Sequence, residues 1–353
     1  MNTRLAWSIA RYFLSLLVII IIGAGIFLWW AVGTTLPKRA LLPIEQPQGL
    51  TPEAPPKNLV VASYNIGHGQ GIKEHAWDYR DKDTTIRQLS LVADAISSMK
   101  AHIVLLQEVD LDSNRTFHIN EIEFILKRTK YPYHACALVW EKNYLPFPFW
   151  PLTHQLGFVR AANCVISRFP LSNHQRIVFD KPESNAFWYN WGYIDRAVER
   201  VDVEVGSQKL ALLNVHLESW ESAARELQIK VAKNYIDEID LPIIFGGDFN
   251  TIPPQDTKRS GFADDPDADY ANEGTLSWFY EHAKDLKVPS LTIKDDIAFE
   301  RYTFPSDHPD RRLDHIFLLG KNLSFVDFRV FYQAGTASDH LPVIATINYR
   351  DAN

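Results

Sequence analysis

The sequence has few sulfur-containing residues and no surplus of basic charge, and both shortages limit what the chain can do. Its 353 residues include two cysteines and two methionines, and the cysteine spacing matches no metal-binding motif. The net charge is −7, and because residues 1–50 carry +3, residues 51–353 carry −10. Lysine and arginine are dispersed apart from Arg311 and Arg312, whereas nucleic-acid grooves need a continuous basic track. The cysteine spacing argues against a zinc site with thiolate ligands. The dispersed basic residues make a nucleic-acid-binding function less favoured.

The two cysteines, Cys136 and Cys164, leave their own bonding open. They could form one disulfide in an oxidising compartment, and a free buried pair is equally compatible with the sequence. Cysteine usage therefore does not identify the compartment.

A long uncharged apolar segment lies near the N-terminus, from Tyr12 to Gly33, and it ends close to Trp29 and Trp30. Twenty-two helical residues cover a bilayer core of about 30 Å, and a tryptophan pair suits the membrane interface. A secretory signal peptide is the alternative, but its apolar region would be about 7–15 residues long and would precede a small-x-small cleavage site. We expect residues 1–33 to be an uncleaved, single-pass anchor that contacts the membrane through residues 12–33. The catalytic domain is expected on the extracytoplasmic side.

Residues 34–57 have little periodicity and contain six prolines, which is typical of an extended linker. The whole chain is 46% hydrophobic, which is enough to form a large core. The remaining residues, 58–353, can therefore form one large domain. We therefore expect a membrane anchor, a proline-rich linker and a single catalytic domain.

Several apolar segments of this domain end on polar residues, which is typical of strands that lead into a functional site. The clearest segment is 242–250, where an apolar strand runs into Gly246 and Gly247 and then into Asp248 and Asn250. Residues two apart on a strand point to one face, so Asp248 and Asn250 project together past the two small glycines. Other polar strand ends occur in residues 59–65, 103–108 and 210–216, and polar clusters follow at 313–317 and 337–342.

Two helical patterns alternate with these strands. Apolar residues recur at helical spacing in residues 84–99, before the strand of Glu108, and in residues 223–239, before the strand of Asp248. Each half therefore repeats a strand, helix, strand order. This predicts an α/β protein with two packed sheets and helices outside them.

In this order, the motifs resemble those of the endonuclease/exonuclease/phosphatase superfamily, which includes DNase I-like nucleases, neutral sphingomyelinases and inositol polyphosphate 5-phosphatases. The matching segments are SYNIG with Asn65, LLQEVD with Glu108, NVHLE with His216, GGDFNT with Asp248 and Asn250, RRLDHIF with Asp314, and SDHLPV with Asp339 and His340. The resemblance spans residues 58–353 and implies a DNase I-like, four-layer α/β/β/α sandwich.

Glu108 is the best candidate for a metal ligand. Hydrolysis of a phosphate ester requires neutralised phosphoryl oxygens, an activated water and help for the departing oxygen. Mg²⁺, or Mn²⁺ in its place, is a hard cation that prefers carboxylates, phosphate oxygens and water. We expect Glu108 to bind this ion, with Asn65 and Asp339 as neighbouring oxygen ligands.

The other matched residues are predicted to be catalytic. We expect Asp248 to orient and deprotonate the attacking water, and Asn250 to hold a phosphoryl oxygen. His216 and His340 can donate to the developing charge or act as general acid or base, because histidine titrates near neutrality. Asp314 is expected to orient His340, and the resemblance implies the same roles.

Residues 158–168 resemble the family's central GNA-ILSR strand, whose asparagine faces the cleft. Ala162 stands where the family has glycine, and we predict Asn163 and Arg160 as substrate-binding residues. Five histidines have no comparable support and are predicted to be structural: His68, His102, His118, His134 and His315.

Two aromatic segments, residues 140–150 and 187–193, contain tryptophan, tyrosine and phenylalanine without periodicity. Core packing is the ordinary explanation for aromatic residues. A loop beside a cleft, where aromatic rings meet a sugar, a base or a lipid, is the alternative. Both explanations remain open at this point.

The sequence favours a membrane-anchored, Mg²⁺-dependent phosphoesterase whose substrate is a phosphodiester or phosphomonoester, with a lipid head group as one candidate. A metal-dependent nuclease of the DNase I type is an alternative, because the same catalytic set cuts DNA in relatives. A non-catalytic phosphate-binding domain is a further alternative, but it would predict losses among the site residues, and none is seen. The oligomeric state is not predicted.

Overall fold

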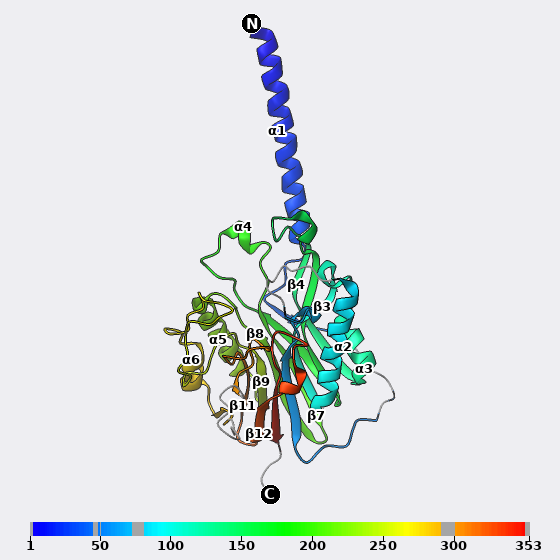
Figure 1. Ribbon diagram of the computed structural model, residues 1–353, viewed down its shortest axis with the longest axis vertical. Coiled ribbons are helices and arrows are strands. Elements are labelled where there is room, and N and C mark those ends of the chain that lie inside the picture. The colour runs from blue at the N-terminus through cyan, green and yellow to red at the C-terminus, as the bar shows by residue number, and fades with distance from the viewer. Residues whose placement is uncertain (1–2, 45–48, 50, 73–80, 291–300, 350–353) are drawn as a thin grey trace.

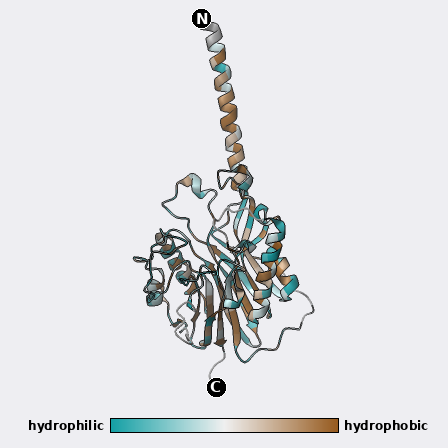
Figure 2. Ribbon diagram, viewed as in Figure 1, coloured by the Kyte–Doolittle hydropathy of each residue, from teal (hydrophilic) through white to brown (hydrophobic). Residues whose placement is uncertain are grey.

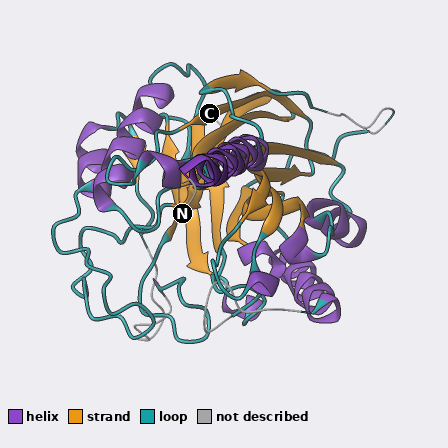
Figure 3. Cartoon of the chain, turned by 90° about the horizontal axis from the view of Figure 1, so that it is seen from above, coloured by secondary structure: helices purple, strands orange, loops and turns teal. Residues whose placement is uncertain are grey.

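Two β-sheets pack face to face in the computed structural model, and helices cover their outer faces (Figure 1). The structure describes the chain except for residues 1–2, 45–48, 50, 73–80, 291–300 and 350–353. Helices α2 and α3 lie outside one sheet, and α5 and α6 lie outside the other, as the view from above also shows (Figure 3). This is the expected α/β/β/α sandwich of the DNase I type, so the predicted fold is confirmed.

The elements follow the chain in a mixed order. The helices are α1 Thr3–Val32, α2 Lys82–Met99, α3 Glu121–Thr129, α4 Phe187–Asn190, α5 Ser222–Ile236 and α6 Thr275–His282. The strands are β1 Arg39–Leu41, β2 Leu59–Asn65, β3 Ile103–Ser113, β4 Tyr133–Leu145, β5 Gly157–Ser167, β6 Leu171–Val178, β7 Ala197–Val205, β8 Gln208–His216, β9 Ile243–Asp248, β10 Leu286–Lys287, β11 Asp314–Leu319, β12 Ser324–Val330 and β13 Val343–Asn348. Short 3-10 helices lie at Gly67–Gly69, Asn114–Thr116, Leu152–His154 and Tyr332–Ala334.

Each sheet contains one parallel pair joined by a helical crossover. The first sheet has the order β1-β6-β7-β8-β9-β11-β10, and the second has the order β12-β13-β2-β3-β5-β4. In the second sheet β2 and β3 are parallel neighbours joined through α2, and in the first sheet β8 and β9 are parallel neighbours joined through α5. Because the carboxyl ends of parallel strands meet at one edge, these two units bring their polar end residues to the same end of the sandwich.

The main core lies between the sheets and beneath α2. Buried aliphatic side chains of β2, β3, β5 and β13 pack there, including Val61, Leu105 and Ile344. A second core, which contains Phe245 and Phe279, lies between the other sheet and helices α5 and α6. The predicted helical patterns correspond to α2 and α5, whose apolar faces are buried against the sheets. The two cores hold the strand ends rigidly in place.

Helix α1 projects from the domain as a long apolar rod (Figures 1 and 2). Residues Trp7–Val32 are long and apolar enough to cross a membrane, by length and composition. The C-terminal end of α1 contacts β4, because the Asn143 side chain donates to the Trp30 carbonyl at 2.8 Å and the rings of Phe27 and Tyr144 lie 5.8 Å apart.

Part of the proline-rich segment 34–57 belongs to a sheet. Residues Arg39–Leu41 form β1, which pairs antiparallel with Gln175–Ile177 of β6. The segment therefore leads from α1 along the edge of the first sheet, and prolines are tolerated on both sides of this short edge strand.

Cys136 and Cys164 form a disulfide. They lie directly opposite each other on the antiparallel strands β4 and β5, with their Cα atoms 4.1 Å apart. The sequence left open whether these two cysteines are bonded or free, and the register of β4 and β5 places them close enough to bond.

Candidate active site

Strand register brings the polar strand ends into one cluster. His216 closes β8, Asp248 closes β9 and Asp314 opens β11, and in the register of these strands His216 and Asp314 both lie directly opposite Asp248. The second sheet contributes Asn65 at the end of β2, where the side chain donates to Asp248 at 3.0 Å. Polar residues distant in sequence are therefore concentrated where the two sheets meet.

Asp248 lies at the centre of this cluster and is almost fully buried. Its Oδ2 atom is 3.5 Å from His216 Nε2 and 3.7 Å from His340 Nε2. The backbone N–H of Asn250 donates to its other oxygen at 2.9 Å. Burial raises the pKa of Asp248 to about 7, since it outweighs the opposing charge of His340.

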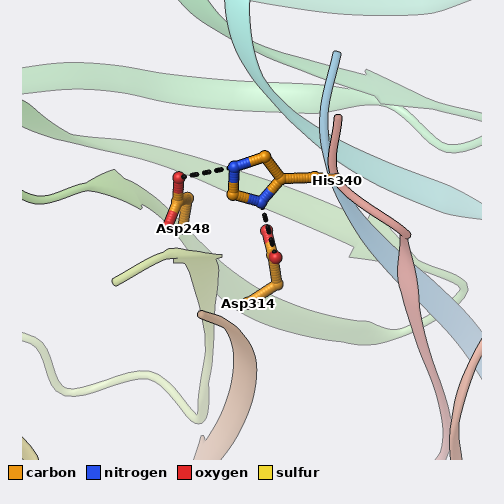
Figure 4. A group of neighbouring side chains, drawn as sticks. All are labelled: Asp248, Asp314 and His340. Carbon is orange, nitrogen blue, oxygen red and sulfur yellow. Dashed lines mark hydrogen bonds and ion pairs between the residues drawn. The ribbon is translucent and has the colours of Figure 1, made fainter. Parts of the chain in front are cut away.

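His340 lies between two carboxylates (Figure 4). Its Nδ1 atom is 2.9 Å from Asp314 Oδ2, and its Nε2 atom points toward Asp248. Burial alone would lower the pKa of His340, but the carboxylates of Asp314 and Asp248 raise it to about 10. The raised pKa favours the imidazolium form of His340 at neutral pH, with Asp314 bonded to its Nδ1 atom.

His216 has the opposite protonation state because a buried arginine lies against it. Arg196 precedes β7, and its Nη1 atom is within hydrogen-bond distance of His216 Nε2. Burial and the Arg196 charge lower the pKa of His216 well below its usual range. Arg196 also leaves its buried Nε atom without a hydrogen-bond partner. Asp248 thus contacts two histidines whose pKa values are shifted in opposite directions, that of His216 downward and that of His340 upward. The buried guanidinium of Arg196 contacts His216.

Glu108 and Asp339 form the more accessible part of the cluster. The Glu108 side chain is 25% exposed, and Asn65 Nδ2 donates to its Oε1 atom at 3.3 Å. Burial raises the pKa of Asp339, with His340 opposing and Glu108 adding to the rise. Gly67 leaves room beside Asp339, because a Cβ atom at residue 67 would lie 2.7 Å from Asp339 Oδ1. Carboxylates such as these two are the ligands that a hard divalent cation prefers.

A second arrangement of possible metal ligands is formed by Asp248, Asp314 and His340, whose ligand atoms lie within 4.8 Å of one another. His340 already contacts both carboxylates, Asp314 through Nδ1 and Asp248 through Nε2.

His68 lies inside the cluster, although the sequence predicted a structural histidine. Its Nε2 atom is 3.1 Å from Glu108 Oε2, and its ring also contacts Asp110 and Arg115. Arg115 donates two hydrogen bonds to the buried carboxylate of Asp110. Burial would raise the pKa of Glu108, but neighbouring positive charge, that of His68 foremost, holds it well below its usual range. His68 therefore connects Glu108 to a buried ion pair.

Three residues of the cluster have left-handed backbone conformations. The φ angles are +52° at His68, +54° at Glu108 and +49° at Asn250. Such conformations are costly for residues other than glycine and persist where the surrounding structure holds them, often at functional sites. For Glu108, the turn of the backbone coincides with an irregularity in the pairing of β3 with β5.

The remaining predicted site residues lie at the edge of the cluster or outside it. Asn250 donates its side-chain hydrogens to the Leu217 carbonyl and to Ser219, so it braces the loop after β9. Asn163 is fully buried on β5 and, with His216 and Arg196, lines a small cavity of about 10 Å³. Arg160 lies on the exposed side of the same strand, where it pairs with Glu141 at 3.3 Å.

The chain resembles known proteins in sequence and in structure. The sequence profile of the Endonuclease/Exonuclease/phosphatase family matches residues 62–340. No curated protein matches the chain. Proteins of this family are typically phosphoester hydrolases.

Solved structures with the same fold come from bacteria and from an animal. An endonuclease/exonuclease/phosphatase from Beutenbergia cavernae is 18% identical, with a TM-score of 0.56, over 84% of this chain and 72% of that chain. A family protein from Bacteroides thetaiotaomicron is 14% identical, with a TM-score of 0.55, over 84% of this chain and 99% of that chain. TDP2 of D. rerio, solved with a single-strand DNA product, is 16% identical, with a TM-score of 0.52, over 83% of this chain and 100% of that chain. The profile match and the shared fold agree with the clustered strand ends: the chain belongs to the Endonuclease/Exonuclease/phosphatase family.

Proposed function

We propose that this protein is a membrane-anchored, Mg²⁺-dependent phosphoesterase that hydrolyses a phosphodiester or phosphomonoester by in-line attack of water. The observation that carries the proposal is the position of Asp248, a buried carboxylate whose Oδ2 atom lies 3.5 Å from His216 and 3.7 Å from His340. Phosphoester hydrolysis requires a group that orients or deprotonates water and positive charge that neutralises the phosphoryl oxygens. Asp248 could supply the first and His340 the second.

Asp248 is the proposed general base. Its pKa of about 7 lets it accept a proton from water near neutral pH and still be ionised in a large fraction of molecules. Asn65 and the backbone N–H of Asn250 donate to the two carboxylate oxygens and hold them in place. Asn250 is thus proposed as a positioning residue for the base.

Positive charge for the phosphoryl oxygens comes from His340 and Arg196. His340 is held as an imidazolium by Asp314 and can donate a proton from Nε2. Arg196 has a buried Nε–H group without a partner, and a phosphoryl oxygen would satisfy it. Asn163, which borders the same small cavity, is proposed as a substrate contact, and Arg160 as a contact for more distant parts of the substrate.

Glu108, Asp339 and Asn65 are proposed to hold Mg²⁺, for which Mn²⁺ could substitute. When bound, the ion supplies charge neutralisation at the phosphoryl oxygens. The two carboxylates suit it because their negative charges otherwise repel each other in a half-buried setting.

The anchor and the disulfide support an extracytoplasmic catalytic domain. Helix α1 has the length and composition of a membrane span. The disulfide between Cys136 and Cys164 favours an oxidising compartment, since cytosolic thiols are kept reduced. With the domain close to a bilayer, a lipid head group is the substrate that we favour.

Hydrolysis of DNA is the second candidate function, because TDP2 of D. rerio has the same fold and was solved with a single-strand DNA product. The full-length protein in detergent would be assayed with Mg²⁺ on plasmid DNA, sphingomyelin, phospholipids and inositol phosphates. Glu108→Ala serves as the blank, and Glu204→Ala, at an exposed residue of β7, serves as the matched control.

Cleavage of lipid by the wild type and by Glu204→Ala, but not by Glu108→Ala, would support the proposal. Nicking of DNA alone would make the protein an anchored nuclease. No hydrolysis of any phosphoester with Mg²⁺ or Mn²⁺ would contradict the proposal and favour a phosphate-binding domain.

A further inference from the structure

Two loops expose large aromatic side chains to an unusual extent. Phe149 and Trp150, between β4 and β5, are 67% and 78% exposed, and Phe187 and Trp188, at α4, are 71% and 58% exposed. Neither loop carries Asp, Glu, Lys or Arg within residues 146–156 or 184–194. We call these two segments the aromatic rim. Exposed aromatic residues gathered without charge mark an interaction surface rather than a core.

The rim lies at the catalytic end of the sandwich. Strand β4 is antiparallel to β5, and β5 is antiparallel to β3, so β4 runs in the same direction as β3. The loop between β4 and β5 therefore extends from the end of the sheet toward which β3 carries Glu108. The other loop leads into β7, whose first residue, Ala197, pairs with His216. The two rim segments thus come from both sheets at the end that holds the candidate site.

Contacts between the loops keep the rim together. Trp140 of β4 donates from its indole nitrogen to the Gly192 carbonyl at 3.1 Å. Tyr193 donates to Glu218 at 2.6 Å, and Glu218 follows the strand that carries His216. The rim is therefore tied to the elements that position the candidate site.

Helix α1 leaves the domain at this same end (Figure 1). Its last turn is attached to β4 through Trp30 and Asn143, only a few residues before the first rim segment. Trp29 and Trp30 are exposed, as are the rim aromatics. If α1 crosses a bilayer, its terminal tryptophans lie in the interface, and the rim lies at the level of that interface.

From this arrangement we propose that the aromatic rim rests on the bilayer that α1 crosses, so that the catalytic end of the domain faces the lipid surface. The proposal rests on the proposed function, because it takes α1 as a membrane span. Tryptophan and phenylalanine partition into the interfacial region, where one part of the ring system is apolar and another can meet water. Because the rim has no charged residue, its contact with lipid depends on apolar burial rather than on anionic head groups.

The position of the rim can be measured with a nitroxide label. Full-length protein carrying Trp150→Cys or Trp188→Cys would be labelled and reconstituted in phosphatidylcholine vesicles. Cys136 and Cys164 are bonded to each other, so the introduced thiol is the one that reacts. Val326→Cys is the matched control, because Val326 is 57% exposed near the start of β12, at the opposite end of the second sheet.

Each label would be probed with oxygen, which concentrates in lipid, and with a water-soluble nickel chelate. We expect the ratio of oxygen to nickel accessibility to be several-fold higher at residues 150 and 188 than at residue 326. Equal nickel accessibility at all three positions would overturn the proposal. Leu152→Cys, in the same exposed loop, replaces either rim variant if that variant does not fold.

Hydrolysis of soluble bis(4-nitrophenyl) phosphate, measured on the same samples, separates this inference from the proposed function. Labelled variants that retain wild-type turnover have a folded active site, so their label positions report on docking alone. A wild type that hydrolysed neither this diester nor the monoester 4-nitrophenyl phosphate would contradict the proposed phosphoesterase function, and the label measurement would still decide whether the rim contacts lipid.

Discussion

His68 connects the accessible carboxylate of Glu108 to the buried pair of Asp110 and Arg115. Side chains that orient a metal ligand affect metal affinity almost as strongly as the ligand itself. We therefore predict that His68→Ala raises the Mg²⁺ concentration needed for half-maximal activity by about tenfold, while turnover at saturating Mg²⁺ changes less. Activity measured against Mg²⁺ concentration tests this.

The control is His118→Ala, since His118 is exposed and pairs with Asp112 on the surface. This variant should show the Mg²⁺ dependence of the wild type. If His68→Ala behaved in the same way as His118→Ala, His68 would have no role in positioning Glu108.

Asp314 is the residue that keeps His340 charged and oriented. Asp314→Asn retains the size of the side chain but removes its negative charge. We predict that it lowers turnover by about a hundredfold or more, in the range of a lost general acid–base group. Steady-state kinetics measures the loss, with exposed Asp327→Asn as the control. Wild-type turnover in Asp314→Asn would show that His340 does not need its carboxylate partner.

The strand-end pattern predicted the residues that the sheets bring together, among them Asn65, His216 and Asp248, because each ends an apolar strand. His68 and Arg196 were missed for a physical reason. Each follows or precedes a strand in an irregular segment, and a lone histidine or arginine carries no periodic signal. The position of His68 three residues after Asn65 was the one clue in the sequence.

At the scale of secondary-structure elements, α3 begins with a fully buried carboxyl group. Glu121 accepts a hydrogen bond from the backbone N–H of Asp110 at 2.7 Å. Burial and the nearby negative charge of Asp110 raise the pKa of Glu121 well above its usual range. The folded protein therefore retains a proton that the unfolded chain releases, and the stability that this group contributes is lost as pH rises above about 4.3, the ordinary value for glutamate.

Glu121→Gln keeps the acceptor and cannot ionise. We predict that the free energy of unfolding of this variant, relative to that of the wild type, is higher at pH 8 than at pH 5. Urea unfolding at both pH values measures this difference, and exposed Glu123→Gln in the same helix should show no such change. A relative stability of Glu121→Gln that does not change with pH would show that Glu121 ionises normally in the folded protein.

The disulfide joins β4 to β5 across 28 residues that include the first rim segment. In the chain-entropy description, closing a loop of this length in the unfolded chain stabilises the folded state by about 3.6 kcal/mol. We predict that Cys136→Ser with Cys164→Ser lowers the free energy of unfolding by about this amount. Chemical unfolding of the double variant and of the reduced wild type should agree, and an unchanged midpoint would mean that the strand pair is held by its hydrogen bonds and packing alone.

The sequence predicted the elements with strong patterns well. The bounds expected for the strand at residues 59–65 match those of β2. Strand β1 was not foreseen, because three residues between prolines have no alternation to detect. The aromatic segments were also undecided, since whether an aromatic ring is buried depends on the sheet beside it, and their exposure emerges only from the fold.

On the scale of the whole molecule, our proposal of a substrate at a membrane rests on the acidic domain, the apolar helix and the exposed rim. Because residues 51–353 carry a net charge of −10, the domain as a whole is repelled by the phosphate backbone of DNA. The family fold supplies the same catalytic end to many phosphoesterases, so specificity depends on the loops around it.

The central claim is that Asp248 activates water in a metal-dependent phosphoester hydrolysis. The most direct measurement is the Mg²⁺-dependent turnover of bis(4-nitrophenyl) phosphate by full-length wild type, by Asp248→Asn and by Asp267→Asn, whose aspartate is exposed. We predict turnover by the wild type and by Asp267→Asn, and a loss of about 10² to 10⁴ in Asp248→Asn with folding unchanged. Wild-type turnover in Asp248→Asn would contradict this role of Asp248, and so would a wild type that hydrolyses neither this diester nor the monoester 4-nitrophenyl phosphate when Mg²⁺ is present.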